Sequence, residues 1–342
     1  MRPIHRHPRT GMTLVELLVV VAILGLLAVT VLPNVSNSAD SRRTREAARV
    51  VSSFIAQSQA RAIGRTEWAG FWLEPPNATS QFALDIFVAD VPQAYRGETL
   101  DATVQVSGDN PVHRGLSYSS NAIDVSRTGI ADGDLIRFDG RGPWFQLGGG
   151  GSLAFLRGPD FGENAGQSVL NTAWPAQGSS AAHTFEILRR PQKSGKPLTL
   201  TDGRCIDLVW SGTGPVSAAD TAGSLSDYQL LATAPGVAVT IVFDASGRAR
   251  QMLRTGASSS SRQAVTQPIF LLVGRADRVP NLPVSYQPQD DTTGANWQRG
   301  DSFWIGIDPV SGIAKVAECR PGATNVVESQ EFIRSELVAE GR

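Results

Sequence analysis

The segment GMTLVELLVVVAILGLLAVTVLP, residues 11–33, is predominantly apolar. Around it, Leu17 to Ala39 forms a run of 23 residues without a charged side chain. A helix rises ~1.5 Å per residue, so ~20 apolar residues span the ~30 Å hydrocarbon core of a bilayer. We therefore expect residues 12–39 to form a helix that crosses a membrane.

One acidic residue, Glu16, lies at the start of this apolar stretch. Burying an unpaired carboxylate is costly, so a positively charged partner is expected. A cut after Gly11 would create a free α-amino group at Met12, four residues before Glu16, and that group would supply the charge.

In this combination, residues 1–33 resemble the N-terminal signal of type IV prepilins and type II secretion pseudopilins. The resemblance implies that a prepilin peptidase cuts after Gly11 and methylates Met12. It also implies that Glu16, the fifth residue after the cut, and Pro33, the twenty-second, are the family's assembly glutamate and kinking proline. Met12 departs from the Phe that is more usual at the new terminus.

Two other interpretations of the N-terminus fit less well. A cleavable secretory peptide has an apolar region of ~7–15 residues followed by its cut site, whereas Gly11 precedes a longer run. An ordinary single-pass anchor fits the hydropathy but leaves Glu16 unexplained. The basic leader, residues 1–11, carries Arg2, Arg6 and Arg9, which places the N-terminus in the cytoplasm and the rest in the periplasm.

The composition describes an ordinary folded chain, with 342 residues, 41% hydrophobic and 18% charged. The net charge is −1, and removal of the leader leaves 28 basic against 32 acidic residues, a net charge of −4. This balance argues against bulk nucleic-acid binding. Cys205 and Cys319 could form a disulfide, which an exported domain allows; two free buried cysteines are the alternative.

Residues 40–64 continue the helix as an amphipathic segment. Small or apolar side chains recur at spacings of three and four, at Ala47, Val51, Phe54 or Ile55, Ser58 and Ala62. The simplest interpretation is one helix of ~50 residues, kinked at Pro33 and ending at Gly64, whose second half packs on a sheet.

Residues 65–342 are expected to be a β-rich domain outside the cytoplasm. Thr66–Leu73 and Gln81–Ala89 read as strands around a Pro-Pro turn. Helix followed by hairpin resembles the H-type minor pseudopilins and their pilus relatives. The segments Leu198–Ser211, with its Ile-Asp-Leu, and Val237–Met252, with its Phe-Asp-x-x-Gly turn, resemble further strands of that group.

Three segments place an Asp and then a Gly between apolar strands, which predicts three β-hairpins. They are Ile136–Leu147, Thr240–Met252 and Phe303–Val316. Residues 95–235 contain the Gly-, Ser- and Pro-rich runs of the chain, so we expect a large insertion of long surface loops. A short C-terminal helix is expected over Ser329–Arg342, with Ser329 as its N-cap.

The sequence offers no catalytic constellation, so an enzyme is not expected. Only His113 and His183 follow the leader, and no P-loop, G-x-S-x-G or H-E-x-x-H string occurs. Two acidic groups carry oxygen ligands suited to calcium but lack the spacing of a calcium loop, and two arginine groups are candidates for phosphate contacts. The acids are Asp132, Asp134 and Asp139, and Asp290 and Asp291; the arginines are Arg42, Arg43, Arg45 and Arg49, and Arg248, Arg250 and Arg254. We expect solvated turns and surfaces, no metal site and no cofactor.

The predicted fold is therefore α+β and pilin-like: a long helix packed on an antiparallel sheet, with a large loop-rich insertion. The predicted function is that of an H-type minor pseudopilin of a type II secretion pseudopilus, assembled through its helix. Gly25 and Pro33 are places where the helix can bend or locally unwind, and a helix–helix contact is the alternative role of Gly25. Implied partners are prepilin peptidase, other pseudopilins or pilins, the inner-membrane platform and the membrane. The alternatives are a type IV minor pilin for adhesion or DNA uptake, and a membrane-anchored exported binding domain or enzyme.

Overall fold

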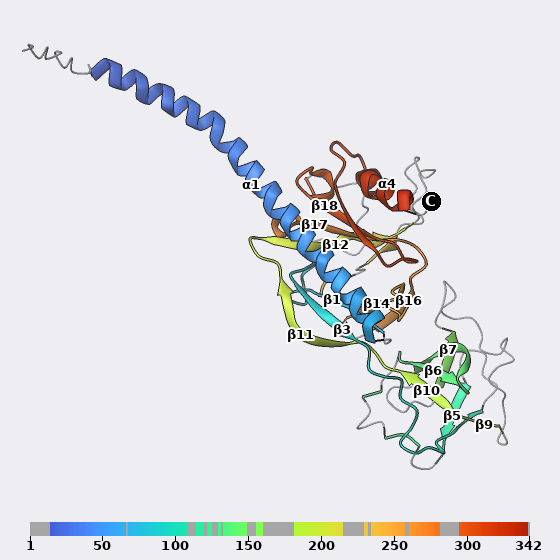
Figure 1. The fold of residues 1–342 in the computed structure, drawn as a ribbon. Coiled ribbons are helices and arrows are strands. Elements are labelled where there is room, and N and C mark those ends of the chain that lie inside the picture. Colours follow the sequence, from blue (N-terminus) through green and yellow to red (C-terminus); the bar gives the residue numbers. More distant parts are fainter. Residues whose placement is uncertain are drawn as a thin grey trace, which may run out of the picture. The chain divides into compact units, whose positions relative to one another are not determined.

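The computed structural model describes most of the chain in twelve ranges. They are residues 14–65, 68–107, 114–119, 122–124, 129–130, 133–148, 155–159, 181–214, 229–231, 234–256, 260–280 and 294–340. The chain divides into two units, Met1–Arg43 and Thr44–Arg342, and each is considered by itself. Mixed helix and antiparallel sheet agree with the expected α+β class (Figure 1).

One helix, α1, extends over Leu14–Arg65, and its first part makes up the described portion of the N-terminal unit. The sequence predicted an end at Gly64, one residue earlier. Pro33 lies within the helical range, and its side chain is outside the described set. Within the described residues, no helix combines the length and apolarity that a membrane crossing needs.

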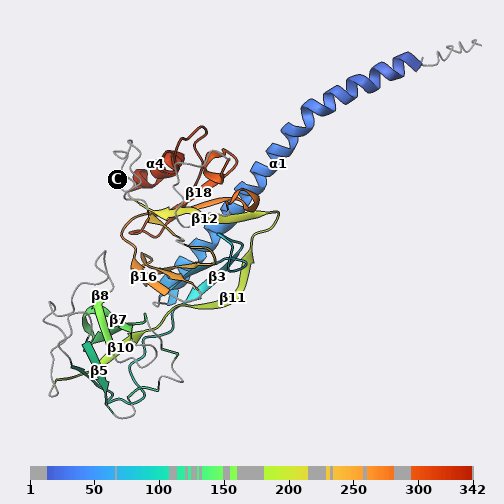
Figure 2. The same ribbon diagram turned by 180° about the vertical axis from the view of Figure 1, so that it is seen from behind.

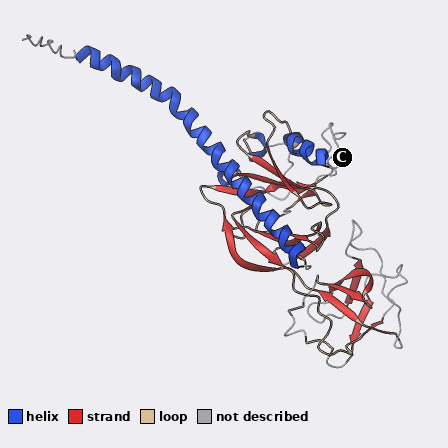
Figure 3. Ribbon diagram, viewed as in Figure 1, coloured by secondary structure: helices blue, strands red, loops and turns tan. Residues whose placement is uncertain are grey.

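Two sheets form the main part of the second unit (Figure 3). Sheet A has six strands in the order β11-β3-β1-β14-β15-β16, and sheet B has the order β13-β12-β17-β18-β19, with β2 paired to β12. The strands of sheet A are β11 (Gln192–Thr199), β3 (Asp85–Asp90), β1 (Ala69–Glu74), β14 (Ala238–Phe243), β15 (Ala249–Thr255) and β16 (Ser260–Ala264). Those of sheet B are β13 (Gln229–Leu230), β12 (Arg204–Thr213), β17 (Ile269–Arg275), β18 (Phe303–Ile307), β19 (Ala314–Glu318) and β2 (Phe82–Ala83).

The second half of α1 shares one hydrophobic core with both sheets. The helix contributes Ala48, Val51, Ile55 and Ala62, each with no exposed surface. Sheet A contributes Phe71 and Ile241, and sheet B contributes Ile206 and Ile305, among others. The i, i+3, i+4 spacing predicted this face, and it is Ile55 that is fully buried, while Phe54 is partly buried.

The three hairpins predicted from Asp and Gly are confirmed. The pairs are β6 with β7, β14 with β15, and β18 with β19, all antiparallel. In the first turn Asp139 and Gly140 have φ of 49° and 64°, and in the others Gly247 and Gly312 have φ of 83° and 70°. The predicted pairing of the strands near residues 66–73 and 81–89 is also observed, because β1 pairs with β3.

The region expected to be a loop-rich insertion, residues 95–235, contains paired strands where it is described. Seven strands pair in the order β10-β6-β7-β8-β5-β4-β9. They are β4 (Val104–Ser107), β5 (Arg114–Tyr118), β6 (Leu135–Phe138), β7 (Arg141–Gly148), β8 (Phe155–Pro159), β9 (Ala182–His183) and β10 (Phe185–Leu188). Strands β11 and β12, which were included in the predicted insertion, belong to sheets A and B instead.

This third sheet closes on itself. Its two end strands, β9 and β10, are separated along the chain by Thr184 alone, so the first and last positions of the strand order are one continuous segment. Side chains at alternate positions fill its interior, as the two-residue repeat of a strand requires: Val104, Val106, Ile136, Phe138, Phe145, Leu147, Phe185 and Ile187. We call it the closed sheet (Figure 2).

The C-terminus covers the other side of sheet B. Helix α3 (Val326–Ser329) and helix α4 (Glu331–Glu340) pack Val326 and Ile333 against Trp210, Trp297 and Trp304. Asn325, whose side chain accepts from Glu328 N, is the N-cap of α3.

The prediction that Ser329 caps the last helix is wrong. Ser329 is fully buried, donates to Trp297 O at 2.6 Å and accepts from Trp304 Nε1 at 3.0 Å. Its hydroxyl therefore satisfies two buried groups of the tryptophan cluster and is not a helix cap.

Candidate functional site

The first turns of α1 expose a continuous apolar surface. Ten large apolar side chains between Leu14 and Leu26 have exposed fractions of 45% to 80%. They are Leu14, Val15, Leu17, Leu18, Val19, Val20, Val21, Ile23, Leu24 and Leu26. A helix that is apolar on every side is found in a membrane or inside a larger assembly. We call residues 14–26 the assembly segment.

The predicted site residues fall on or next to this segment. Gly11 and Met12 lie outside the described residues. Glu16 occupies the first turn of α1, where the partial positive charge of a helix N-terminus favours a carboxylate. A methyl group added at Gly25 would meet nothing within 4 Å in the chain, so this position offers open helix surface.

Three polar contacts fix the second half of α1 to the sheets. Arg45 pairs with Glu318 at 2.6 Å and lies 5.5 Å from the Phe303 ring centre. Gln59 donates through Nε2 to Gly247 O at 2.9 Å and to Ser311 O at 2.6 Å, and so connects two of the hairpin turns.

The third contact is a bidentate ion pair at the end of α1. Arg61 donates from Nε and from a terminal nitrogen to the two oxygens of Asp90, at 2.7 and 2.6 Å, and Arg65 lies 3.6 Å away. Burial acts to raise the pKa of Asp90, but the hydrogen bonds from Arg61 and Ser194 and the two positive charges outweigh it and lower the pKa. We call this contact the Asp90 clamp.

The chain also buries a carboxylate to which the sequence assigned no role. Asp207, the Asp of the Ile-Asp-Leu string, is fully buried at the point where the pairing of β12 with β17 shifts register. It accepts from Val209 N at 3.1 Å and from Asn296 Nδ2 at 3.0 Å. An Asp inside an apolar strand is the sequence feature that indicates such a residue, because a buried carboxylate needs buried hydrogen-bond donors.

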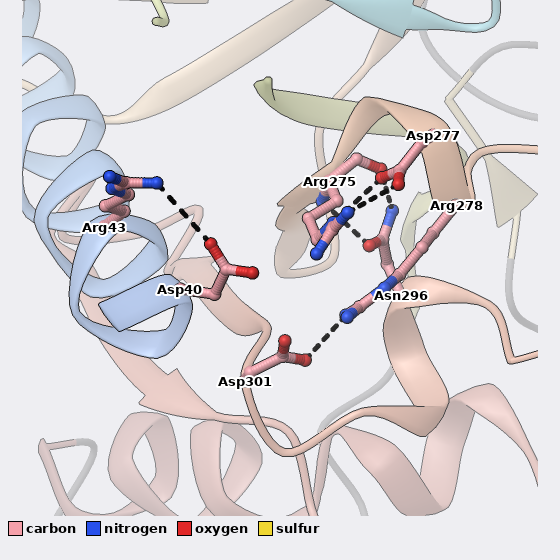
Figure 4. Close-up of polar contacts among 7 residues, drawn as sticks. All are labelled: Asp40, Arg43, Arg275, Asp277, Arg278, Asn296 and Asp301. Carbon is pink, nitrogen blue, oxygen red and sulfur yellow. Dashed lines mark hydrogen bonds and ion pairs between the residues drawn. The ribbon is translucent and has the colours of Figure 1, made fainter. Parts of the chain in front are cut away.

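Charged residues beside Asn296 are paired with one another (Figure 4). Arg275 binds Asp277 at 2.6 Å, and Arg278 binds Asp301 at 2.7 Å. The hydrogen bond from Arg275 lowers the pKa of Asp277, despite partial burial. Asn296 accepts from Arg275 N at 2.8 Å, so it links this surface to the buried Asp207.

Several of the arginines considered for phosphate contact have protein partners. Arg43 lies 3.8 Å from Asp40, and Arg250 lies 2.7 Å from Asp244 (Figure 4 for the first). Arg254 donates to Leu231 O at 2.6 Å. Arg42 and Arg49 are exposed on α1, and Arg248 is exposed in the turn between β14 and β15. The two groups therefore include neutralised and partly buried members as well as exposed ones.

The acidic residues weighed as a calcium site do not converge where they are described. Asp134 is buried beside Arg190, with 3.5 Å between them, while Asp139 accepts from Thr184 N and lies 2.8 Å from His183 Nδ1. Asp132, Asp290, Asp291 and His113 lie outside the described residues. Within the described ranges, no three His, Cys, Asp or Glu residues gather as metal ligands do.

His183 is buried within the closed sheet. It lies in β9 with 6% of its surface exposed, and its ring packs edge-on against Phe138 at 6.0 Å. The contact with His183 helps to lower the pKa of Asp139, against a raising effect of burial. We infer that Asp139 and His183 support the junction between β9 and β10.

The disulfide considered for Cys205 and Cys319 is not formed, because both thiols are free and buried. Cys205 lies in β12 opposite Gly274, and Cys319 follows β19, three strands away in sheet B. At ~4.8 Å per strand the two positions are roughly 14 Å apart, about twice the Cα separation a disulfide spans. Burial raises the pKa of both thiols.

Comparison with known proteins gives one result, at the N-terminus. Residues 6–32 match the family model described as the prokaryotic N-terminal methylation motif. No curated protein and no solved structure gives a significant match to the chain. Gly11, Met12, Glu16 and Gly25 lie inside the matched range, and Pro33 directly follows it. The motif implies processing by prepilin peptidase and assembly with other pilins, and it indicates a type IV pilin-like protein.

Proposed function

We propose that this protein is an H-type minor pseudopilin, a structural subunit of a type II secretion pseudopilus, and that it acts by assembly and not by catalysis. The observation that carries the proposal is the assembly segment: ten exposed large apolar side chains that lie inside a matched methylation motif. A surface of this kind needs a cover of lipid or of neighbouring apolar helices.

Before assembly, the inner membrane supplies that cover. The leader lies in the cytoplasm and the Thr44–Arg342 unit in the periplasm, as the arginines before the apolar stretch favour. During assembly, apolar helices of neighbouring subunits replace the lipid. The proposed assembly uses no cofactor.

Glu16 sets the register of that replacement. After the cut, the ammonium group of Met12 in one subunit pairs with the Glu16 carboxylate of its neighbour. Desolvation offsets much of the attraction between two such charges in an apolar environment. The larger effect is specificity, because one axial stagger alone brings the two charges together.

The order of elements supports the H-type assignment. The helix is followed by the β1–β3 hairpin, the strand β12 carries Ile206-Asp207-Leu208, and the β14–β15 hairpin turns at Asp244. Asp244 accepts from Ser246 N at 2.8 Å and from Arg250 Nε at 2.7 Å, and these bonds lower its pKa although burial acts to raise it. The Phe-Asp-x-x-Gly string thus builds a tight, charged turn.

The first test is the N-terminal mass of protein extracted from membranes of cells with an active prepilin peptidase. A methylated Met12 terminus is expected. A chain that still begins at Met1 would contradict the proposal and favour an ordinary anchor.

The second test is the variant Glu16→Ala, with Glu46→Ala as the matched control on the exposed surface of the same helix. Glu16→Ala is expected to leave cleavage and folding intact and to reduce incorporation into filaments about tenfold or more, equivalent to ~1.4 kcal/mol. Incorporation equal to that of Glu46→Ala would refute the charge-pair account.

Retardation of DNA by the Thr44–Arg342 unit, lost stepwise with salt, would favour a DNA-uptake pilin instead.

A further inference from the structure

The closed sheet is inserted into a single hairpin of sheet A. The chain leaves sheet A at Asp90, the last residue of β3, and returns at Gln192, the first residue of β11. Asp90 and Gln192 are direct antiparallel partners, as are Ala89 and Lys193. Directly opposed residues lie ~4.5–5.5 Å apart at Cα, so the two ends of residues 91–191 nearly meet.

The inserted residues have a hydrophobic core of their own. The buried side chains that fill the closed sheet contact one another, and they form a cluster separate from the core shared by α1 and sheets A and B. A smaller cluster connects the closed sheet to sheet A. It consists of Val91, Leu135, Leu188, Val242 and Leu253, with Trp68 and Trp144 packed against it.

We propose that residues 91–191 are an accessory domain that folds as a separate unit and is dispensable for both the main fold and assembly through α1. The strands that flank residues 91–191, β3 and β11, are direct partners, so a tight turn is long enough to join them in place of the accessory domain. The second half of the proposal, dispensability for assembly, rests on the proposed function.

The Asp90 clamp connects the point where the accessory domain departs to the last turns of α1. Asp90, from which the domain departs, is held by Arg61 and Arg65 in the last turns of α1, and by Ser194 on the returning strand. All four residues lie outside 91–191. Excision therefore leaves the clamp complete, and the accessory domain is attached directly at the C-terminal end of α1.

The first experiment replaces residues 91–191 of the full chain with Asn-Gly, a two-residue turn suited to paired flanking residues. Hydrogen exchange of the detergent-solubilised protein measures the protection of backbone amides in α1 beyond Thr44 and in sheets A and B. Their protection is expected to stay within about threefold of the intact chain, because among the described residues seven side chains form the cluster that joins the closed sheet to sheet A. Loss of protection throughout sheets A and B would overturn dispensability for the main fold.

Excision also exposes Trp68, Val242 and Leu253, so a second experiment keeps the chain intact. Phe138→Ala removes a fully buried ring from the closed sheet, and Phe71→Ala removes one from the core of sheet A. Phe138→Ala is expected to raise exchange by about a hundredfold within residues 104–188 and by less than about threefold in β1 and β14. Equal increases in both regions would overturn separate folding, whatever the excised chain does.

Assembly is read out by incorporation of the excised chain into filaments, beside the intact chain and Glu16→Ala. Incorporation of the excised chain within about twofold of the intact chain supports dispensability. A folded excised chain that fails to incorporate overturns it. Because Glu16→Ala tests the assembly segment in the presence of the accessory domain, normal incorporation of that variant would instead count against the proposed function.

Discussion

The two halves of α1 have the same backbone conformation and opposite relations to their surroundings. Between Leu14 and Leu26, apolar side chains occupy nearly every position and are exposed. Between Thr44 and Arg65, apolar and small side chains recur every three or four residues, and the face that they form is fully buried. Helical geometry is common to both halves, so side-chain spacing is what differs.

This difference separates two roles of hydrophobic residues. The second half contributes to the stability of the Thr44–Arg342 unit, because its apolar face leaves water when the unit folds. In the first half, the described residues 14–26 keep their apolar side chains exposed, and that surface is available for lipid or another helix. Substitutions in the two halves should therefore affect different measurements.

The largest expected difference in the free energy of unfolding is between the variants Ile55→Ala and Ile23→Ala. Ile55 has no exposed surface, whereas 55% of Ile23 is exposed. Ile55→Ala should lower the free energy of unfolding of the Thr44–Arg342 unit by about 2–5 kcal/mol through lost burial and a cavity. Denaturant unfolding of the detergent-solubilised chain measures this.

Ile23→Ala is the matched control, and it should change that free energy by less than about 0.5 kcal/mol. It should reduce retention in membranes or filaments instead. Equal destabilisation by both variants would show that the first half of α1 also packs in the core.

The next largest difference concerns two glycines, Gly70 in β1 and Gly25 in α1. A Cβ at Gly70 would lie 1.9 Å from Ile241 O on the paired strand β14, so Gly70→Ala must push the strands apart. A cost of about 1–3 kcal/mol or more in unfolding free energy is expected, measured by denaturant.

The methyl group added by Gly25→Ala would contact nothing within 4 Å. Alanine is a better helix former than glycine, so the substitution should stabilise the helix locally by ~1 kcal/mol. The unfolding free energy of the Thr44–Arg342 unit should not change. Reduced filament incorporation of Gly25→Ala would assign Gly25 to bending or helix contact, and unchanged incorporation would remove it from the assembly residues.

The smallest expected effect on the free energy of unfolding is the pH-dependent contribution of the Asp90 clamp. The folded state lowers the pKa of Asp90 below its ordinary value of 3.8, so its contribution is complete above pH ~3.8 and is lost as the pH falls through the lowered pKa. Asp90→Asn should cost about 1 kcal/mol or less at pH 7, since both partners are partly exposed.

That cost should shrink as the pH falls below 3.8, and comparing the intact chain with Asp90→Asn at each pH subtracts the other acids. Arg61→Gln should show the same pH dependence. A cost that stays constant down to pH 2 would mean that the clamp acts through packing and not through charge.

Local sequence signals predicted several parts of the fold. The three hairpins follow from Asp and Gly at fixed positions, because a turn with positive φ is decided by a few neighbouring residues. The buried face of α1 follows from spacing in the same way. The methylation motif, too, lies within a single continuous stretch.

The closed sheet could not be predicted by this reasoning. Its strands are as short as β9, Ala182–His183, and they lie among glycine- and serine-rich segments that read as loops. They become strands because β4 pairs with both β5 and β9, which are far apart in sequence from one another. Such pairing depends on contacts across the chain and leaves no local pattern.

Short continuous stretches of sequence are sufficient to predict the apolar residues 14–26, the position of Glu16 among them, the amphipathic half of α1 and the three hairpin turns. Each depends on residues within one turn or one helical repeat of each other. Contacts between distant segments keep Cys205 and Cys319 apart, place Ser329 in the tryptophan cluster, and form the closed sheet between Asp90 and Gln192. Those outcomes depend on which distant strands pair with one another. The free energy that favours one strand pairing over another comes from many contacts throughout the core.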